Sequence, residues 1–418
     1  MKIKISQNSL WQLLYVLCIA VPYLDNFELT FFTWCTTFVL TLCKKYSLDI
    51  FKIVIPYILI LILAGIFTFR NQHELYFIIR DITYLSKPII GFLVGYQLYK
   101  KNASLAFDLI VKTGVFIALC HIYTIFSAIV LHHARTVSDL RFYSGYFSDY
   151  EIYVFIILLF HKQFGLDISK NKIRIFTVIV GFSAFMYLAR TNFIQFGILY
   201  FALKGYLVIN KRTIALYGSI VIASVVAYSA IVYSNPKRDA KGLEGMLYKI
   251  KVAPLEPFKT KINRHDWKEF NDNYRSYENI MTIRQVTSDG WVSTLFGKGL
   301  GSKIDLKQEV LLGDMKLRFI SILHNGFMIV FLKSGILGIL IYLFTITFFF
   351  KKKSSMHPQI RTINLLFLGT GIFLLISNWV FLGFYNLTES KSILIGFLIA
   401  YRENLIKNEK HSIPSSIS

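Results

Sequence analysis

The chain has 418 residues, of which 55% are hydrophobic and 17% charged, and its formal net charge is +22. This composition excludes a soluble globular protein of this length, and the continuous apolar runs exclude a transmembrane β-barrel, which requires short alternating segments. The basic excess does not indicate nucleic-acid binding, because Lys and Arg cluster in short loops between apolar runs, where they act as topology signals. The sequence therefore predicts an all-α integral membrane protein.

Apolar segments long enough to approach a membrane span recur along the whole chain. They cover about twelve stretches: 10–24, 29–42, 51–69, 77–99, 109–131, 152–164, 173–188, 192–208, 214–233, 326–350, 362–384 and 392–405. Basic residues mark every second connection, for example Lys44-Lys45, Lys100-Lys101 and Lys351-Lys352-Lys353. By the positive-inside rule, both termini are then cytoplasmic.

This topology divides the chain into four parts. Residues 1–233 carry helices one to nine, residues 234–323 form one large outer loop, residues 324–406 carry the last three helices, and residues 407–418 are a cytoplasmic tail. The outer loop contains aromatic residues among its charges, which is untypical of a linker. We expect amphipathic helices over 268–286 and 304–322, separated by the glycine-rich turn 297–301.

His324 is the first candidate for chemistry. Histidine titrates near neutral pH, and His324 lies where the outer loop enters a membrane helix, so it could take a proton from a substrate hydroxyl. Asn325 could orient the imidazole or the same hydroxyl. The alternative is an interfacial histidine with no special role.

Arg190 is the second candidate, because it interrupts two apolar runs on the outer side, where topology does not call for a positive charge. Its guanidinium could bind a diphosphate, or it could be an arginine that only extends to the membrane surface. Further outer arginines could join it, namely Arg141, Arg264, Arg275 and Arg284. Each alone is typical of a solvated charge.

Three charges fall in or near the fourth apolar segment. Arg80 and Asp81 are expected to form a structural ion pair or to lie at a helix end close to the outer face, and Lys87 to extend to the surface or line a cavity. The four cysteines suggest neither a disulfide framework nor a metal site. No Walker A motif or metal-ligand spacing is present, so an enzyme built from this chain would work without a metal or cofactor, through arginine charge and a histidine.

Several local motifs resemble the superfamily of bacterial O-antigen polymerases and O-antigen ligases. They are Leu188-Ala189-Arg190-Thr191 before an apolar helix, the glycine turn Leu295-Phe296-Gly297-Lys298-Gly299-Leu300-Gly301 with Arg284 upstream, and His324-Asn325-Gly326-Phe327 followed by Lys333-Ser334-Gly335-Ile336-Leu337-Gly338. Arg141 to Gly145 is similar to a fourth, weaker element, although Asp149 stands where an asparagine is frequent. The resemblance spans about residues 141–350.

The resemblance implies a fold like that of the large lipid-linked glycosyltransferases (the GT-C class) in the bacterial inner membrane, with a periplasmic active site. It implies a metal-independent transfer of glycan from undecaprenyl diphosphate, with Arg190 and Arg284 on the diphosphate and His324 on the acceptor hydroxyl. Arg141, Arg264, Arg275 and Asn325 would help to bind substrate. The expected partners are the lipid-linked oligosaccharide, inner-membrane lipids and a chain-length regulator protein, and no nucleic acid.

A polymerase is preferred over a ligase, which would move the finished chain to lipid A-core, because only fragments of the motifs are present. A flippase of lipid-linked sugar is the alternative from another class. It is less favoured because no inverted repeat is visible and few charges lie in the apolar segments.

Overall fold

The computed structural model describes residues 6–70, 73–102, 106–208, 211–237, 243–252, 259, 261–263, 266–312, 315–355 and 357–412. These residues are mostly helical, and each of the twelve apolar segments expected from the sequence contains a helix. Within the described ranges, four helices are long and apolar enough to cross a membrane: Leu48–Thr68, Phe107–Leu131, Gly326–Phe350 and Pro358–Trp379. The chain is therefore a membrane-embedded helical protein.

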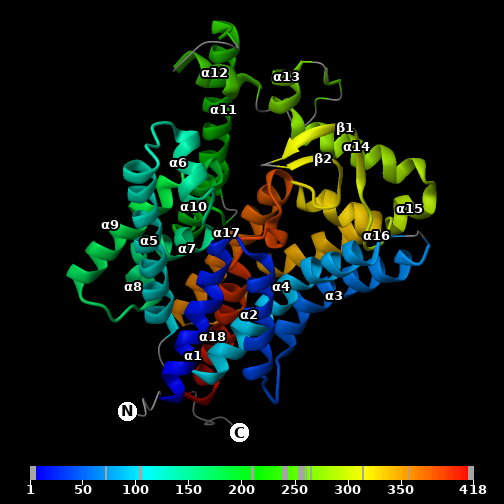
Figure 1. Ribbon diagram of the computed structural model, residues 1–418. Coiled ribbons are helices and arrows are strands. Elements are labelled where there is room, and N and C mark those ends of the chain that lie inside the picture. Colours follow the sequence, from blue (N-terminus) through cyan, green and yellow to red (C-terminus); the bar gives the residue numbers. More distant parts are fainter. Residues whose placement is uncertain are drawn as a thin grey trace.

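One helical bundle combines the two ends of the chain. It contains α1 (Gln7–Ala20), α2 (Phe27–Leu40), α3 (Leu48–Thr68), α4 (Leu75–Lys101), α17 (Pro358–Val380) and α18 (Lys391–Ser412). In Figure 1, α1 begins and α18 ends at the bottom of the molecule. Glycines let α4 and α18 approach closely, since a Cβ on Gly95 would lie 1.9 Å from the Ile393 oxygen.

A second group of helices lies beside this bundle (Figure 1). It consists of α5 (Ala106–Leu131), α6 (Val137–Ser144), α7 (Asp149–Leu159), α8 (His161–Phe164), α9 (Lys170–Met186), α10 (Arg190–Leu203) and α11 (Lys211–Ser234). Buried side chains from both groups join one core. For example, the Tyr15 hydroxyl of α1 lies 3.1 Å from the Tyr150 hydroxyl of α7.

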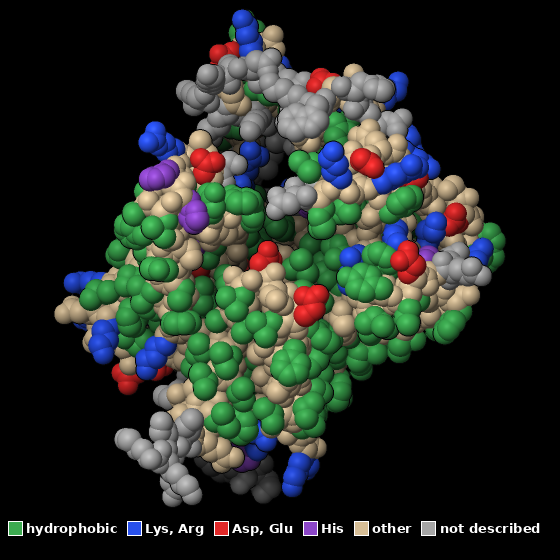
Figure 2. Space-filling model, viewed as in Figure 1, with side chains coloured by type: hydrophobic (Ala, Val, Ile, Leu, Met, Phe, Trp, Pro, Cys, Tyr) green, Lys and Arg blue, Asp and Glu red, His purple; other side chains and the backbone are tan. Residues whose placement is uncertain are grey.

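The segment expected to be the outer loop is structured and lies at the opposite end from the start of α1 (Figure 1). It contains α12 (Leu243–Val252), α13 (Trp267–Asp272), α14 (Tyr274–Ser288), α15 (Trp291–Phe296), β1 (Ile304–Leu312) and β2 (Met315–Ile320). Hydrophobic side chains cover most of the middle of the face in Figure 2, and charged side chains gather above them over this segment.

The expectation of an amphipathic helix over 304–322 is wrong, because this segment forms an antiparallel β-hairpin. Ile304 and Leu306 are buried while Lys307 and Glu309 are exposed, and a register shift between Asp305 and Val310 interrupts the alternation. A β-bulge of this kind disturbs the period of two by which a strand is recognised in sequence. The expected helix over 268–286 is present as α13 and α14.

The glycine-rich turn 297–301 fits into a kink of α16 (Gly326–Thr347). Gly335 interrupts α16 with φ of 66°, and the Lys298 N–H donates to the Leu332 oxygen at 2.8 Å. On its other side the turn contacts α3, where the Leu300 N–H donates to Thr68 Oγ1 at 2.8 Å. The turn thus joins α3 to α16, and its backbone donors are used in this packing.

A buried ion pair closes the same junction. Lys333 Nζ lies 2.6 Å from Asp81 Oδ2, and both side chains are almost completely buried. The Gly301 N–H donates to the same carboxylate at 2.6 Å, and Lys333 also donates to the Ser302 oxygen. The expected pairing of Asp81 with Arg80 is therefore wrong, because the Arg80 guanidinium lies over the Phe77 ring at 4.9 Å.

Replacing Gly299 by alanine is expected to destabilise this junction. Gly299 has φ of 80°, and an added Cβ would lie 2.5 Å from the Thr68 nitrogen. The backbone strain costs about 1–2 kcal/mol and the steric overlap adds to it. Gly205→Ala is the matched control, because Gly205 has φ of 79° but open space around it. Thermal unfolding of the purified variants in detergent measures the difference, and equal losses would contradict the packing role.

Candidate active site

His324 and Glu278 form a hydrogen-bonded pair where the outer segment enters α16. His324 Nδ1 lies 3.2 Å from Glu278 Oε2, and the His324 backbone N–H donates to the same oxygen at 3.0 Å. The Glu278 side chain is fully buried in α14, whereas the His324 side chain is 46% exposed. A carboxylate can only accept a hydrogen bond, so Nδ1 is the donor in this pair and Nε2 is the ring nitrogen left for contact with a substrate.

Tyr274 and Asn325 fix the surroundings of this pair. The Tyr274 ring meets the His324 ring edge-on at 5.7 Å between centroids. Burial and the nearby Glu278 carboxylate raise the pKa of the Tyr274 hydroxyl, which therefore stays protonated. Asn325 caps α16, because its Oδ1 accepts from the Phe327 and Met328 N–H groups. Its amide nitrogen is buried, so the structure gives Asn325 the role of a helix cap and does not place it at an open surface.

Arg275 is on α14, the helix that also carries Glu278. Its guanidinium lies 5.6 Å from the centre of the Phe381 ring. The Phe381 oxygen accepts from the N–H of Gly326, two residues after His324. Arg275 is exposed and comes three residues before Glu278 on α14, so it belongs to the helix that holds the imidazole.

Arg141 approaches the same aromatic contact from the other side. Its guanidinium lies 5.5 Å from the Tyr146 ring, and the adjacent Phe147 stacks on Phe381 at 5.4 Å. The face in Figure 2 is hollowed between α6, which carries Arg141, and the β1–β2 hairpin. Phe381 therefore links the segments that carry Arg275 and Arg141 across the chain.

Two buried lysines hold the backbone beneath this contact. Lys391 Nζ lies 2.7 Å from Asp149 Oδ2 and donates to the Gly383 oxygen at 2.8 Å. Lys87 donates to the Asn386 oxygen at 2.9 Å and to the Leu387 oxygen. The expectation that Lys87 extends to the surface is wrong, because its side chain is buried against backbone carbonyls.

Arg190 begins α10 and is exposed. Helices α10 and α17 are antiparallel neighbours: a Cβ on Gly369 would lie 2.9 Å from Ala202 near the far end of α10. Nearer to Arg190, Gln195 donates to the backbone oxygen of Asp149 at 3.4 Å. The Asp149 carboxylate pairs with Lys391, which also donates to the Gly383 oxygen in the chain after α17. The end of α10 that carries Arg190 thus lies beside the end of α17 that leads to Phe381.

Arg284 lies apart from the histidine. It lines a separate surface pocket of about 670 Å³ together with Lys261 and Lys307. Arg284 is six positions after Glu278 on α14, which places it about 9 Å farther along the helix axis and on a different face. Arg264, another expected substrate-binding residue, lies outside the described residues.

Sequence reasoning missed Glu278, Tyr274 and Phe381. One signal was available for Glu278: it falls four residues after Tyr274 and three before Met281, on the face of α14 that is buried. An acidic residue on the buried face of an amphipathic helix needs a partner, so it marks a candidate functional group. No comparable local pattern marked Phe381.

Comparison with known proteins adds no family to this picture. No protein-family model, no curated protein and no solved structure matches the chain.

Proposed function

We propose that this protein is a surface-polysaccharide polymerase of the O-antigen type. It transfers a growing glycan from undecaprenyl diphosphate to a hydroxyl of an incoming lipid-linked repeat unit. The single observation that carries the proposal is the His324–Glu278 pair, in which an exposed imidazole is held by a buried carboxylate. Arg275, which is on the same helix as Glu278, and the local resemblance of the motifs around Arg190 and His324 support the choice of substrate.

The transfer can be written with these groups in named roles. The acceptor hydroxyl attacks the anomeric carbon of the donor glycan, and its proton passes to His324 Nε2. The bond from that carbon to the diphosphate oxygen breaks, and the electron pair leaves with undecaprenyl diphosphate. Arg275 and Arg190 offset the negative charge that develops on the leaving group. Glu278 is a positioning residue, because it acts through the imidazole.

We also propose how the chain crosses the membrane. All twelve apolar segments lie in the bacterial inner membrane in a GT-C-like arrangement, with both termini cytoplasmic and His324 at the periplasmic face. Two observations support this. Basic residues mark every second connection, and α1 begins at the opposite end of the molecule from the segment that precedes His324 (Figure 1).

Reconstitution tests the function directly. The purified protein in liposomes is expected to convert lipid-linked repeat units, extracted from its host, into a ladder of longer lipid-linked glycans. Glycan appearing on lipid A-core, with no ladder, would identify a ligase instead. Movement of lipid-linked glycan across the bilayer without any new glycosidic bond would identify a transporter and overturn the proposal.

Arg275→Ala is expected to lower the rate of ladder formation by roughly a hundredfold, because one charge donor to the leaving group is lost. Arg284→Ala is the matched control: this arginine is on the same helix and also exposed, but it lines a different pocket. Initial rates at saturating substrate give the comparison. A larger loss for Arg284→Ala would assign the diphosphate to the other pocket.

A further inference from the structure

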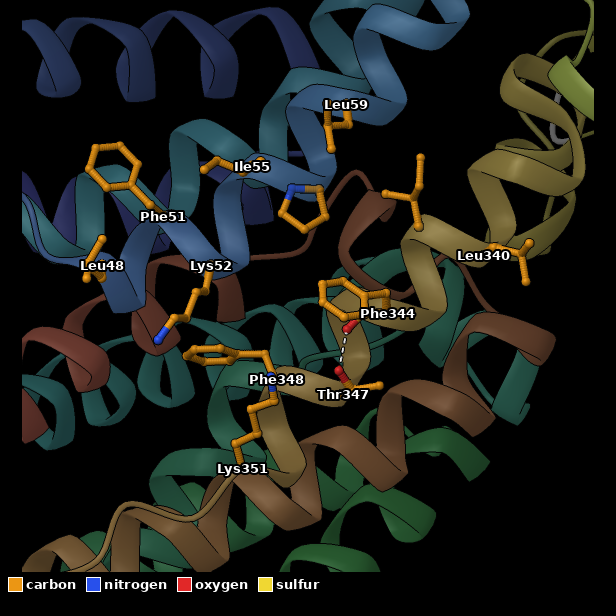
Figure 3. Close-up of a pocket in the computed structure, with 12 residues that line it drawn as sticks. Leu48, Phe51, Lys52, Ile55, Leu59, Leu340, Phe344, Thr347, Phe348 and Lys351 are labelled. Atoms are coloured by element: carbon orange, nitrogen blue, oxygen red, sulfur yellow. Dashed lines mark hydrogen bonds between the residues drawn. The ribbon is translucent and has the colours of Figure 1, made fainter.

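An apolar groove runs between α3 and α16, far from His324. Its walls are formed by Phe51, Ile55, Leu59, Leu340, Phe344 and neighbouring side chains, and it has a volume of about 490 Å³. Lys52 and Lys351 line one end, and Leu59 and Leu340 line the other (Figure 3). Both helices are long and apolar enough to cross a membrane, so the open side of the groove faces lipid.

We propose that this groove binds one anionic glycerophospholipid. An acyl chain lies along the apolar walls, and the phosphate lies between Lys52 and Lys351. The exposed fractions of Ile55, Leu340 and Phe344 are 46%, 57% and 61%, so these side chains offer an open apolar surface to an acyl chain. Residues 340–351 span about 16 Å at 1.5 Å per residue, roughly the depth of one leaflet's hydrocarbon.

The charges at the groove end favour an anionic headgroup. Lys52 lies 3.5 Å from Asp49, but Lys353 binds the same carboxylate at 2.8 Å and Arg402 lies 3.8 Å from it. The Asp49 carboxylate is therefore already paired with other cations. Lys52 and Lys351 are exposed and retain positive charge for a phosphate.

Geometry separates this lipid from the proposed substrate. The groove's cationic end follows the last turn of α16, whereas His324 precedes its first turn. The part of α16 after the Gly335 kink alone extends about 18 Å. A diphosphate at Lys351 would therefore be out of reach of His324. A second copy of the chain is also disfavoured as occupant, because two such surfaces would bring four lysines together.

Native mass spectrometry with added lipid tests the proposal on the intact purified protein. Phosphatidylglycerol is expected to bind more tightly than phosphatidylethanolamine. Lys52→Gln and Lys351→Gln are each expected to weaken phosphatidylglycerol binding by roughly fivefold. Lys352→Gln, the neighbouring exposed lysine outside the groove, is expected to leave binding unchanged.

A second pair of variants tests the apolar part. Leu340→Trp is expected to block the groove and weaken both phospholipids, whereas Leu343→Trp, on the same helix but outside the groove, should not. Equal binding of the two phospholipids by the unchanged protein, or no effect of the lysine changes, would overturn the proposal. The proposal would also be overturned if undecaprenyl phosphate displaced phosphatidylglycerol, or if a dimer of the protein covered the groove. Because the readout is lipid binding, it is independent of polymerase activity, and His324→Gln should bind phosphatidylglycerol normally.

Discussion

His324→Gln is expected to reduce ladder formation by about 10²- to 10⁴-fold, because the acceptor hydroxyl loses its general base. Glutamine keeps much of the side-chain volume and can still donate toward Glu278, so the protein should fold normally. Binding of the lipid-linked donor should be retained, since the proposed diphosphate contacts come from arginines. Turnover and donor binding measured on the same preparation separate the two effects.

Glu278 provides the internal control for that result. Glu278→Gln keeps an oxygen that can accept from the His324 backbone N–H, but it removes the carboxylate that orients the imidazole. This variant should have a lower kcat and a nearly unchanged KM. Combined with His324→Gln, it should cause little further loss, because both changes act on one group. Full activity in both single variants would reject this site.

Lys333→Met is expected to destabilise the fold by about 3–5 kcal/mol, because it leaves the Asp81 carboxylate buried without its cation. The pair lies at the junction of α16, α4 and the glycine turn, and α16 is the helix that follows His324. Loss of the pair should therefore lower both thermal stability and activity. Unfolding temperature and yield of monodisperse protein in detergent give the measurement.

Two further variants sharpen this prediction. Asp81→Asn combined with Lys333→Met should recover most of the stability, because no uncompensated charge remains and an amide oxygen can still accept from the Gly301 N–H. Lys112→Met is the matched control: its ion pair with Asp108 has the same length of 2.6 Å but is exposed, so its loss should cost less than about 1 kcal/mol. A similar cost for both lysines would mean that burial does not decide the result.

The two predictions separate a loss of catalysis from a loss of folding stability. His324 variants should remain stable and fail to react, whereas Lys333 variants should lose stability first. The Gly299 variant belongs with Lys333, because the turn 297–301 supplies a backbone donor to Asp81 through Gly301.

The sequence by itself determined the membrane class, the positions of most helices and the place of His324 at the boundary between the outer segment and a helix. Those features depend on local composition and on apolar runs, which read directly along the chain. The glycine turn was also visible, although its role in joining α3 to α16 was not. The bulged hairpin over 304–320 was misread because its alternation is interrupted.

Only the tertiary structure decided the partners of the charges. Glu278 meets His324 across 46 residues, and Asp81 chooses Lys333 over the adjacent Arg80. Such pairings follow from which helix faces pack together, and burial makes an unpaired charge too costly, so the nearest residue in sequence has no advantage. For the same reason Arg284 lines a separate pocket although it is on the same helix as Glu278: a few residues along one helix change the face on which a side chain lies.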